Sequence, residues 1–230
     1  TGEGTDTLSG IETANLTGGA GDNTIDASGF SGAATVTGDA GADVLSGGTG
    51  SDSLSGGDGD DIIDGGAGDD VISGGEGSDQ VAQVTDTDQM LSDTLLTGEG
   101  TDTLSGIETA SLTGGDGDNT IDASTFTGAV TMSGAAGADT LTGGMSADSL
   151  SGGTGDDMIT GGEGNDHLDG GGGSDVVEGG AGDDVITGGE GSDDLEGDAG
   201  ADVISGGPGD DDLFGGADDD DITGDEGSDA

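Results

Sequence analysis

The chain has no lysine, no arginine and no cysteine among its 230 residues, and it also lacks tryptophan and tyrosine. Without Lys and Arg it cannot neutralise phosphate groups, which excludes nucleic acids and anionic membrane surfaces as partners. Without Cys it has neither disulfides nor thiolate metal ligands. Its 52 acidic residues therefore have no internal ion pairs available to them, apart from one with His167.

Apolar residues are also scarce. Hydrophobic residues make up 27% of the chain, and its aromatic residues are Phe30, Phe126 and Phe214. No apolar run approaches the ~20 residues that a membrane-spanning helix needs, so we expect no membrane insertion. This composition is typical of a disordered acidic polyelectrolyte, and only a regular pattern argues against that hypothesis.

Such a pattern is present, because the chain contains two nested repeats. Residues 1–82 align without a gap on residues 97–178, with 58 identities in 82 positions. Within them runs a nine-residue unit, G-G-x-G-x-D-x-U-x, where U is Leu, Ile or Val; five copies fill 38–82 and ten fill 134–223. Position six is Asp and position eight is apolar in all fifteen copies. Isolated copies lie at 18–26 and 114–122. Disorder does not require this regularity.

The nine-residue spacing indicates short strands joined by tight turns. An apolar residue between two variable ones predicts a three-residue strand whose central side chain points inward. Glycines at positions one, two and four suit turns that need a positive φ and close backbone approach. Two units then make one coil with a strand on each side, and coils stack about 4.8 Å apart. We therefore predict an all-β fold, a parallel β-helix.

The repeats divide the chain into four segments. We interpret 1–37 and 83–133 as irregular β-solenoid rungs, 38–82 as a first nonapeptide array and 134–230 as a longer second array. Residues 83–96 contain no glycine, and a short helix over 88–95 is the alternative there. Because the chain begins at Thr1 and stops partway through a repeat at 224–230, we expect it to be a piece of a longer protein.

The aspartates at position six are the candidate metal ligands. Stacking one carboxylate per turn creates like-charge repulsion along the solenoid, and the chain offers no organic cation to relieve it. Carboxylates and turn carbonyls are hard oxygen ligands, which favours Ca²⁺ over Mg²⁺, whereas zinc and copper lack their ligands. One ion between every two copies on the same side gives 5 − 2 = 3 and 10 − 2 = 8 sites, about eleven Ca²⁺. The predicted ligands, including one in the incomplete last repeat, are Asp43, Asp52, Asp61, Asp70, Asp79, Asp139, Asp148, Asp157, Asp166, Asp175, Asp184, Asp193, Asp202, Asp211, Asp220 and Asp229.

Copies such as GGTGSDSLS, GGDGDDIID, GGAGDDVIS and GGAGDDVIT resemble the RTX (repeats-in-toxin, haemolysin-type) calcium-binding nonapeptide. The resemblance covers 38–82 and 134–230. It implies a right-handed parallel β-roll that holds Ca²⁺ through the position-six Asp and turn carbonyls, export in the unfolded state by a type I system, and folding in extracellular calcium. Some copies depart from the pattern, which puts calcium binding at their turns in doubt: Ser146 and Asp218 at position four, Asp39, Ala135 and Asp198 at position two, and Asn23 and Asn119 at position six of the isolated copies.

These observations predict a calcium-binding structural segment of a secreted bacterial extracellular protein, such as an adhesin stalk, surface layer, matrix or filament component. The alternative is the C-terminal secretion and folding module of a secreted hydrolase or toxin. We expect no catalysis, because the chain lacks Trp, Tyr and Arg for a sugar site and Lys for a P-loop, and His167 should point into solvent. Outward apolar residues at position seven suggest lateral packing against another chain or domain: Ile62, Val71, Val176, Val185 and Val203.

Overall fold

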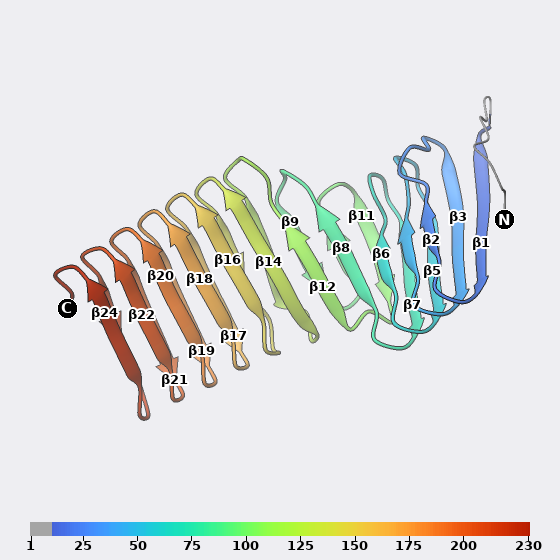
Figure 1. Ribbon diagram of the computed structural model, residues 1–230. Coiled ribbons are helices and arrows are strands. Elements are labelled where there is room, and N and C mark those ends of the chain that lie inside the picture. Colours follow the sequence, from blue (N-terminus) through green and yellow to red (C-terminus); the bar gives the residue numbers. More distant parts are fainter. Residues whose placement is uncertain (1–10) are drawn as a thin grey trace.

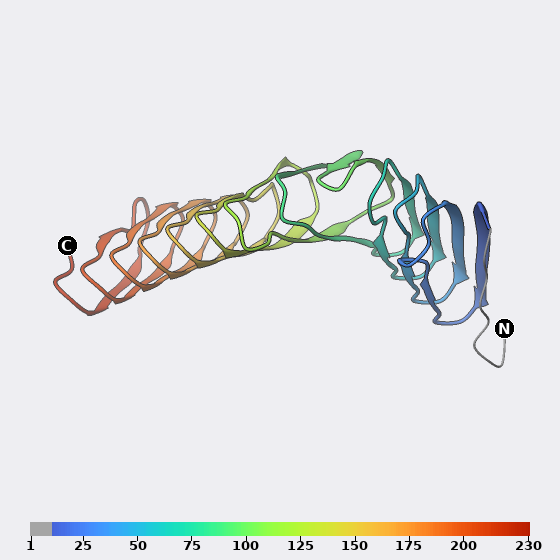
Figure 2. The same ribbon diagram turned by 90° about the horizontal axis from the view of Figure 1, so that it is seen from above.

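The computed structural model describes residues 11–230, which form 24 β-strands and no helix. The first ten residues of the predicted rung segment 1–37 lie outside the described residues. The strands lie side by side along one axis (Figure 1), and the view from above shows two walls enclosing a narrow interior (Figure 2). The fold is a parallel β-solenoid of about 12 turns.

The strands form two sheets, one on each wall of the solenoid. The 13-stranded sheet has the order β1-β3-β5-β7-β11-β10-β9-β13-β15-β17-β19-β21-β23. Its strands are β1 (Thr13–Ala20), β3 (Ala33–Ala40), β5 (Ser53–Asp58), β7 (Val71–Glu76), β9 (Gln89–Ser92), β10 (Leu95–Thr97), β11 (Thr101–Ser105), β13 (Thr120–Thr125), β15 (Thr140–Thr142), β17 (Met158–Glu163), β19 (Val176–Ala181), β21 (Asp194–Ala199) and β23 (Asp212–Phe214).

The 11-stranded sheet has the order β2-β4-β6-β8-β12-β14-β16-β18-β20-β22-β24. Its strands are β2 (Thr24–Asp26), β4 (Val44–Ser46), β6 (Ile62–Asp64), β8 (Gln80–Val84), β12 (Thr109–Thr113), β14 (Ala129–Ala136), β16 (Ser149–Thr154), β18 (His167–Gly172), β20 (Val185–Glu190), β22 (Val203–Pro208) and β24 (Asp221–Glu226). This sheet is parallel throughout, and it runs without interruption from the first array into the second.

The register confirms that two nonapeptides make one coil. On the 11-stranded sheet, His167 of β18 lies opposite Val185 of β20, which is eighteen residues along the chain. On the other sheet, Met158 of β17 lies opposite Val176 of β19 at the same spacing. Equivalent positions of alternate nonapeptides therefore form ladders that run along the solenoid axis.

The core is a row of position-eight side chains contributed by the two sheets in turn. Leu150, Ile159 and Leu168 are buried at 1%, 0% and 0% exposure, while the neighbouring position-seven residues face outward. This alternation follows from the two-residue period of a strand. Because each nonapeptide supplies one apolar side chain, the sequence needs few hydrophobic residues to fill the interior.

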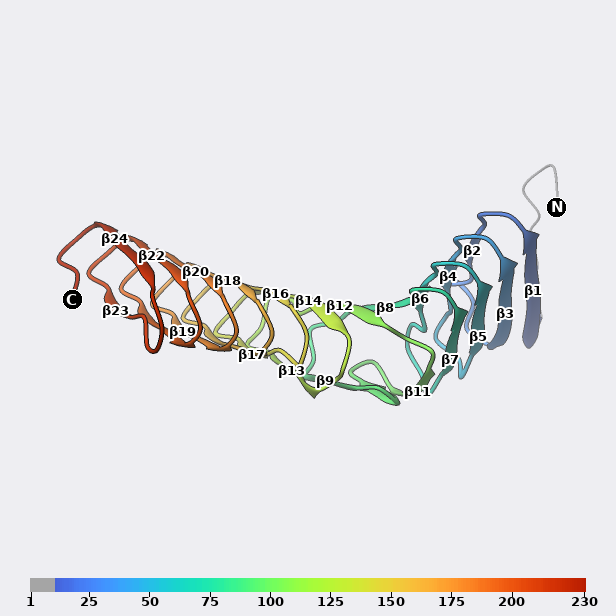
Figure 3. The same ribbon diagram turned by 90° about the horizontal axis from the view of Figure 1, so that it is seen from below.

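The glycine-free stretch departs from the parallel pattern. Strand β10 pairs antiparallel with both β9 and β11. The prediction of an entirely parallel fold is therefore wrong for this one strand of the 13-stranded sheet. Only two residues separate β9 from β10, and a connection of that length joins antiparallel strands. The alternative helix over 88–95 is wrong, since Leu91 of β9 and Leu96 of β10 lie opposite each other in the sheet and are buried. Figures 2 and 3 show that the solenoid axis changes direction between the two arrays, in the segment 83–133 that we call the junction.

Candidate metal centre

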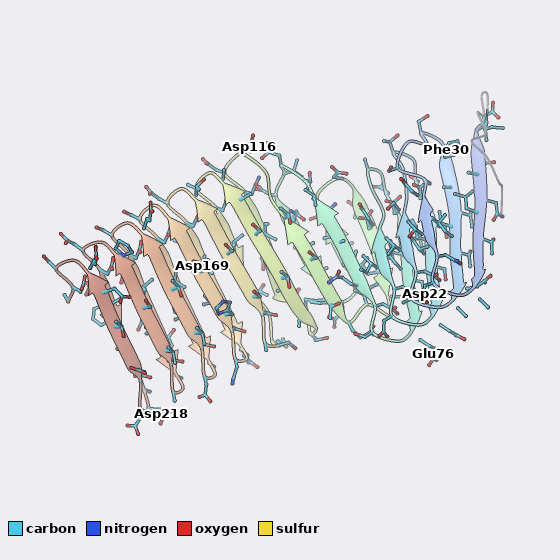
Figure 4. The ribbon with its side chains drawn as sticks, in the orientation of Figure 1. Asp22, Phe30, Glu76, Asp116, Asp169 and Asp218 are labelled. Carbon is cyan, nitrogen blue, oxygen red and sulfur yellow. The ribbon has the colours of Figure 1, made fainter. Side chains whose placement is uncertain are left out.

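The predicted aspartates lie on the inner side of the turns, just before the strands. Fourteen of the sixteen are at most 4% exposed: Asp43, Asp52, Asp61, Asp70, Asp79, Asp139, Asp148, Asp157, Asp166, Asp175, Asp184, Asp193, Asp202 and Asp211. Asp220 is half-buried and Asp229 is exposed. Other acidic residues lie outside, and Figure 4 shows Asp116 and Asp218 at opposite edges of the solenoid. Burial thus separates the position-six carboxylates from the general surface charge.

Each buried aspartate links two coils through one of its oxygens. The main-chain nitrogen of Asp166 donates to Oδ1 of Asp184 at 2.8 Å, and that of Asp184 donates to Oδ1 of Asp202 at 2.9 Å. The main-chain nitrogen of Val185 in turn donates to the carbonyl oxygen of Asp166 at 2.9 Å. These bonds fix the orientation of the carboxylate and place its second oxygen, Oδ2, inside the turn.

That second oxygen is left without a partner in most turns. Asp52 and Asp148 are exceptions, since their Oδ2 atoms accept hydrogen bonds from Gly48 and Gly144 at 2.6 and 2.7 Å. A buried polar atom without a partner costs about 1–3 kcal/mol, and more when it is charged. Within residues 11–230, Oδ2 is buried without a hydrogen-bond partner in Asp43, Asp61, Asp70, Asp79, Asp139, Asp157, Asp166, Asp175, Asp184, Asp193, Asp202 and Asp211.

In most turns Oδ2 faces a main-chain carbonyl across a space that only glycine leaves open, and this includes the hydrogen-bonded Oδ2 atoms of Asp52 and Asp148. A Cβ atom on Gly161 would contact Oδ2 of Asp166 and would lie 2.6 Å from the carbonyl oxygen of Gly179, one coil further on. We call this space, bounded by the position-six Oδ2 of one nonapeptide and the position-one carbonyl of the next coil, a cradle. Cradles of this kind lie at Gly38, Gly47 and Gly56 in the first array and at Gly134, Gly143, Gly152, Gly161, Gly170, Gly179, Gly188, Gly197 and Gly206 in the second.

The electrostatics of the cradles oppose negative charge. Burial, and to a smaller extent the neighbouring aspartates of the ladder, raise the pKa of Asp166 to about 7 and the pKa values of Asp175 and Asp184 to about 6. The hydrogen bonds from the preceding coil act in the opposite direction but are outweighed. A ladder of ionised aspartates is therefore unfavourable unless a cation occupies the cradles.

The donors of the cradles fit calcium. Each cradle offers a carboxylate oxygen and carbonyl oxygens of flexible turns, which are the hard ligands that Ca²⁺ accepts in variable geometry. Nowhere in the described chain do three or more His, Cys, Asp or Glu side chains converge as a metal cluster. Further ligands therefore have to come from the carbonyls of the turns, which are among the oxygens that Ca²⁺ accepts.

The turns with departures at position two keep the same backbone. Asp39, Ala135 and Asp198 have φ values of 78°, 79° and 70°, the left-handed conformation that glycine adopts easily. Asp218, at position four, also has a positive φ of 82°. Their carbonyls hence keep the direction that the repeat requires, and the departures add backbone strain without remodelling the turn.

In the isolated copies, an amide takes the place of the carboxylate. Asn119 is buried, its Oδ1 accepts from Gly115 at 2.8 Å, and its main-chain nitrogen donates to Oδ1 of Asp139 at 2.7 Å. Asn23 donates to Asp43 in the same way, at 2.7 Å. Both residues continue the ladder without adding a charge, so these two turns offer calcium no carboxylate oxygen.

Sequence reasoning missed two acidic residues that extend the ladder. Asp102 is 2% exposed, and its Oδ1 accepts from the main-chain nitrogen of Asp70 at 3.0 Å. Burial raises its pKa to about 6. Residues 97–105 follow the nonapeptide pattern with Thr97 in place of the first glycine, and a search that tolerated this change would have found Asp102. The second residue, Glu108, lies outside any nonapeptide copy and could not be found this way.

The exposed apolar side chains at position seven are on the outer faces, as predicted. Ile62, Val71, Val176, Val185 and Val203 are 37–55% exposed, and Val185 lies beside Val203 on adjacent strands. Their packing against another chain or domain stays a prediction. No helix of the described residues has the length and apolarity needed to cross a membrane.

A parallel solenoid whose turns stack buried carboxylates around glycine-lined cradles defines a calcium-binding repeat protein. The chain belongs to the RTX calcium-binding nonapeptide repeat family. The model of this family, which spans four copies, matches residues 15–29, 28–63, 46–81, 111–126, 127–150, 142–177, 169–204 and 196–230. A comparison with curated proteins finds no match. Repeats of this family bind calcium.

Proposed function

We propose that this chain is a calcium-folded structural segment of a secreted bacterial extracellular protein, without catalytic activity. The ladder of buried aspartate oxygens that lack a partner carries this proposal, because it makes the folded state dependent on a bound cation. Membership of a family whose proteins are generally secreted supports the extracellular setting. The internal repeat of residues 1–82 at 97–178, a spacing of 96 residues, supports a role in extending the molecule. Each added coil lengthens a solenoid without adding a new kind of site.

In this proposal the position-six aspartates are the calcium ligands. The structure contains twelve cradles with both a carboxylate oxygen and a carbonyl of the next coil, three in the first array and nine in the second. The arrays alone account for eleven, and the twelfth is the cradle at Gly206, which the incomplete repeat 224–230 completes with the carbonyl of Gly224. We therefore expect one Ca²⁺ per cradle, with the irregular segments 11–37 and 83–133 acting as spacing rungs.

The test is calcium-dependent folding of the chain. Circular dichroism in excess EDTA at neutral pH should show a disordered chain, and addition of Ca²⁺ should produce a β-sheet signal. Mg²⁺ at the same concentration is the matched control, and it should act weakly because it demands a tighter octahedral site and keeps its waters. A β-sheet signal that is already complete in EDTA would contradict the proposal, as would equal effects of the two ions.

The alternative, a secretion and folding module of a hydrolase or toxin, uses the same calcium chemistry. The sequence that precedes Thr1 in the gene separates the two functions. A globular domain that contains Lys and Arg and a catalytic site would support the module, whereas further acidic repeats would support the structural segment.

A further inference from the structure

The junction that follows the first array contains a contact between a nonapeptide turn and a segment that does not follow the nonapeptide pattern. Residues 106–108 lie between two of the segments that match the family model, which end at 81 and resume at 111. They pack on the turn of the last copy in the first array, 74–82: the main-chain nitrogens of Glu108 and Thr109 both donate to the carbonyl oxygen of Asp79 at 3.0 Å.

The side chain of Glu108 takes the place that a position-six Asp occupies in the regular coils. Its Oε2 accepts from the main-chain nitrogen of Asp79 at 2.9 Å, just as Oδ1 of Asp79 accepts from Asp61 at 2.9 Å one coil earlier. Glutamate is one methylene longer, which lets its carboxylate reach the turn from a segment that does not follow the nonapeptide path. The acidic ladder is therefore continued by a different residue type.

Two oxygens of this junction, from Asp79 and Gly106, lie as close to the position-one glycine as those of a regular cradle. Asp79 is 0% exposed, and its Oδ2 is among the buried oxygens without a hydrogen-bond partner in the described residues. A Cβ atom on Gly74 would contact both this Oδ2 and the carbonyl oxygen of Gly106. Gly106 has a φ of 59°, a left-handed conformation that directs its carbonyl into the turn at little cost.

The opposite face of the same junction provides an internal contrast. There, Asp70 also has a buried, unpaired Oδ2, but the three atoms nearest to a Cβ atom on Gly65 belong to Asp70 and Ile72, and none is a carbonyl oxygen of the following coil. Of the two faces, the one at Asp79 places a carbonyl oxygen closest to the position-one glycine, beside the unpaired carboxylate oxygen.

We propose that Asp79, Glu108 and the carbonyl of Gly106 form a further calcium site that joins the first array to the junction. The proposal rests on calcium binding by the regular cradles and adds one ion to them. Because Glu108 is exposed and Asp79 is buried, the ion would lie at the rim of the turn, open to solvent on one side. Its effect is to tie residues 106–109, which follow the change of axis, to the end of the first array.

Native mass spectrometry of the full chain in saturating Ca²⁺ tests this site, because it counts bound ions one at a time. E108Q keeps an acceptor for the amide of Asp79 but removes the charge, and it should lose one ion. E163Q makes the same change at an exposed glutamate of a regular coil and should lose none. D79N should also lose one ion, and the double variant D79N/E108Q should lose one rather than two, because both residues bind the same ion.

The outcomes separate this site from the general function. If E108Q binds as many ions as the unaltered chain, the junction site is wrong while the cradles stand. If E108Q and E163Q lose ions equally, a general charge effect explains the loss and the site is again wrong. If the unaltered chain binds no calcium, the proposed function itself fails. Should E108Q fail to show a β-sheet signal in calcium, D79N decides: unchanged ion number in that variant contradicts the site.

Discussion

The main-chain nitrogen of Asp148 donates a 2.8 Å hydrogen bond to Oδ1 of Asp166, eighteen residues along the chain. The same relation recurs between successive coils of both arrays, so each buried aspartate uses one oxygen to hold the preceding coil. In twelve of these aspartates the other oxygen is buried without a hydrogen-bond partner and is free to bind a cation, whereas in Asp52 and Asp148 it accepts a main-chain hydrogen bond. Coil stacking and metal binding are therefore performed by the same side chain, and changes at this position should affect both.

Replacement of Asp166 by Asn should have opposite effects with and without calcium. The amide keeps an oxygen for the hydrogen bond from Asp148 but loses the charge. In calcium we expect D166N to be less stable by about 1–3 kcal/mol, because a charged ligand is lost. Without calcium we expect the β-sheet signal of D166N to appear at a higher pH during acidification than that of the unaltered chain, because ladder repulsion falls. Urea unfolding in Ca²⁺ measures the first effect, and an acid titration of the metal-free chain followed by circular dichroism measures the second; D212N, at an exposed position seven, is the control and should change little.

Replacement of a position-one glycine should fill a cradle. In G161A the new methyl group would contact Oδ2 of Asp166 and crowd the carbonyl of Gly179. We expect the loss of one bound ion and about 1–3 kcal/mol of stability, since overpacking adds to the lost ligand. Gly172 is the matched control, because a Cβ atom there meets nothing within 4 Å. Equal ion numbers for G161A and G172A would show that the cradle is not the binding place.

Replacement of Ala135 by Gly should stabilise the fold. Ala135 has a φ of 79°, where an L-residue with a Cβ costs roughly 1–2 kcal/mol. Glycine removes this strain but gives the unfolded chain more freedom, which costs about 0.4–1 kcal/mol. The net gain in calcium should be about 0.5–1 kcal/mol, seen as a higher urea midpoint. Loss of stability in A135G would mean that the methyl group makes a compensating contact.

The calcium-free chain should become more stable as the pH falls. The pKa of Asp166 and that of Asp70 are raised to about 7, and those of Asp102, Asp175 and Asp184 to about 6. The pKa values of these groups in the folded state lie above that of an unfolded aspartate, so the folded state binds protons more tightly. The stability that this proton binding contributes is fully present below about pH 4 and is lost as the pH rises through 6 to 7. Circular dichroism of metal-free protein should show β-sheet appearing upon acidification. A signal that stays unchanged from pH 8 to pH 4 argues against buried carboxylates in the metal-free fold.

Much of the fold followed from local sequence because the nonapeptide specifies each coil independently. Position eight predicted the buried row, with Leu150 and Ile159 as examples, and position six predicted the buried aspartates. Solenoid coils contact only their neighbours, so a local pattern suffices to place them.

The junction could not be predicted in this way. The antiparallel strand β10 depends on how Leu91 and Leu96 fill the core between two arrays, which no repeat encodes. The place of Asp102 was hidden by a single change, Thr97 for Gly, whereas the place of Glu108 depends on a tertiary contact with Asp79. The nine-residue spacing of the sequence identifies the candidate ligands. Only the structure shows that Oδ1 of Asp166 bonds to the preceding coil while its Oδ2 is left unpaired.

The most direct test of the central claim is the number of calcium ions bound per chain at the end of a folding titration followed by circular dichroism. If calcium occupies the cradles, the β-sheet signal should appear cooperatively and reach its plateau with about twelve ions bound, or thirteen with the junction site. A plateau with only two or three ions, or a β-sheet signal that precedes calcium binding at neutral pH, would contradict the account.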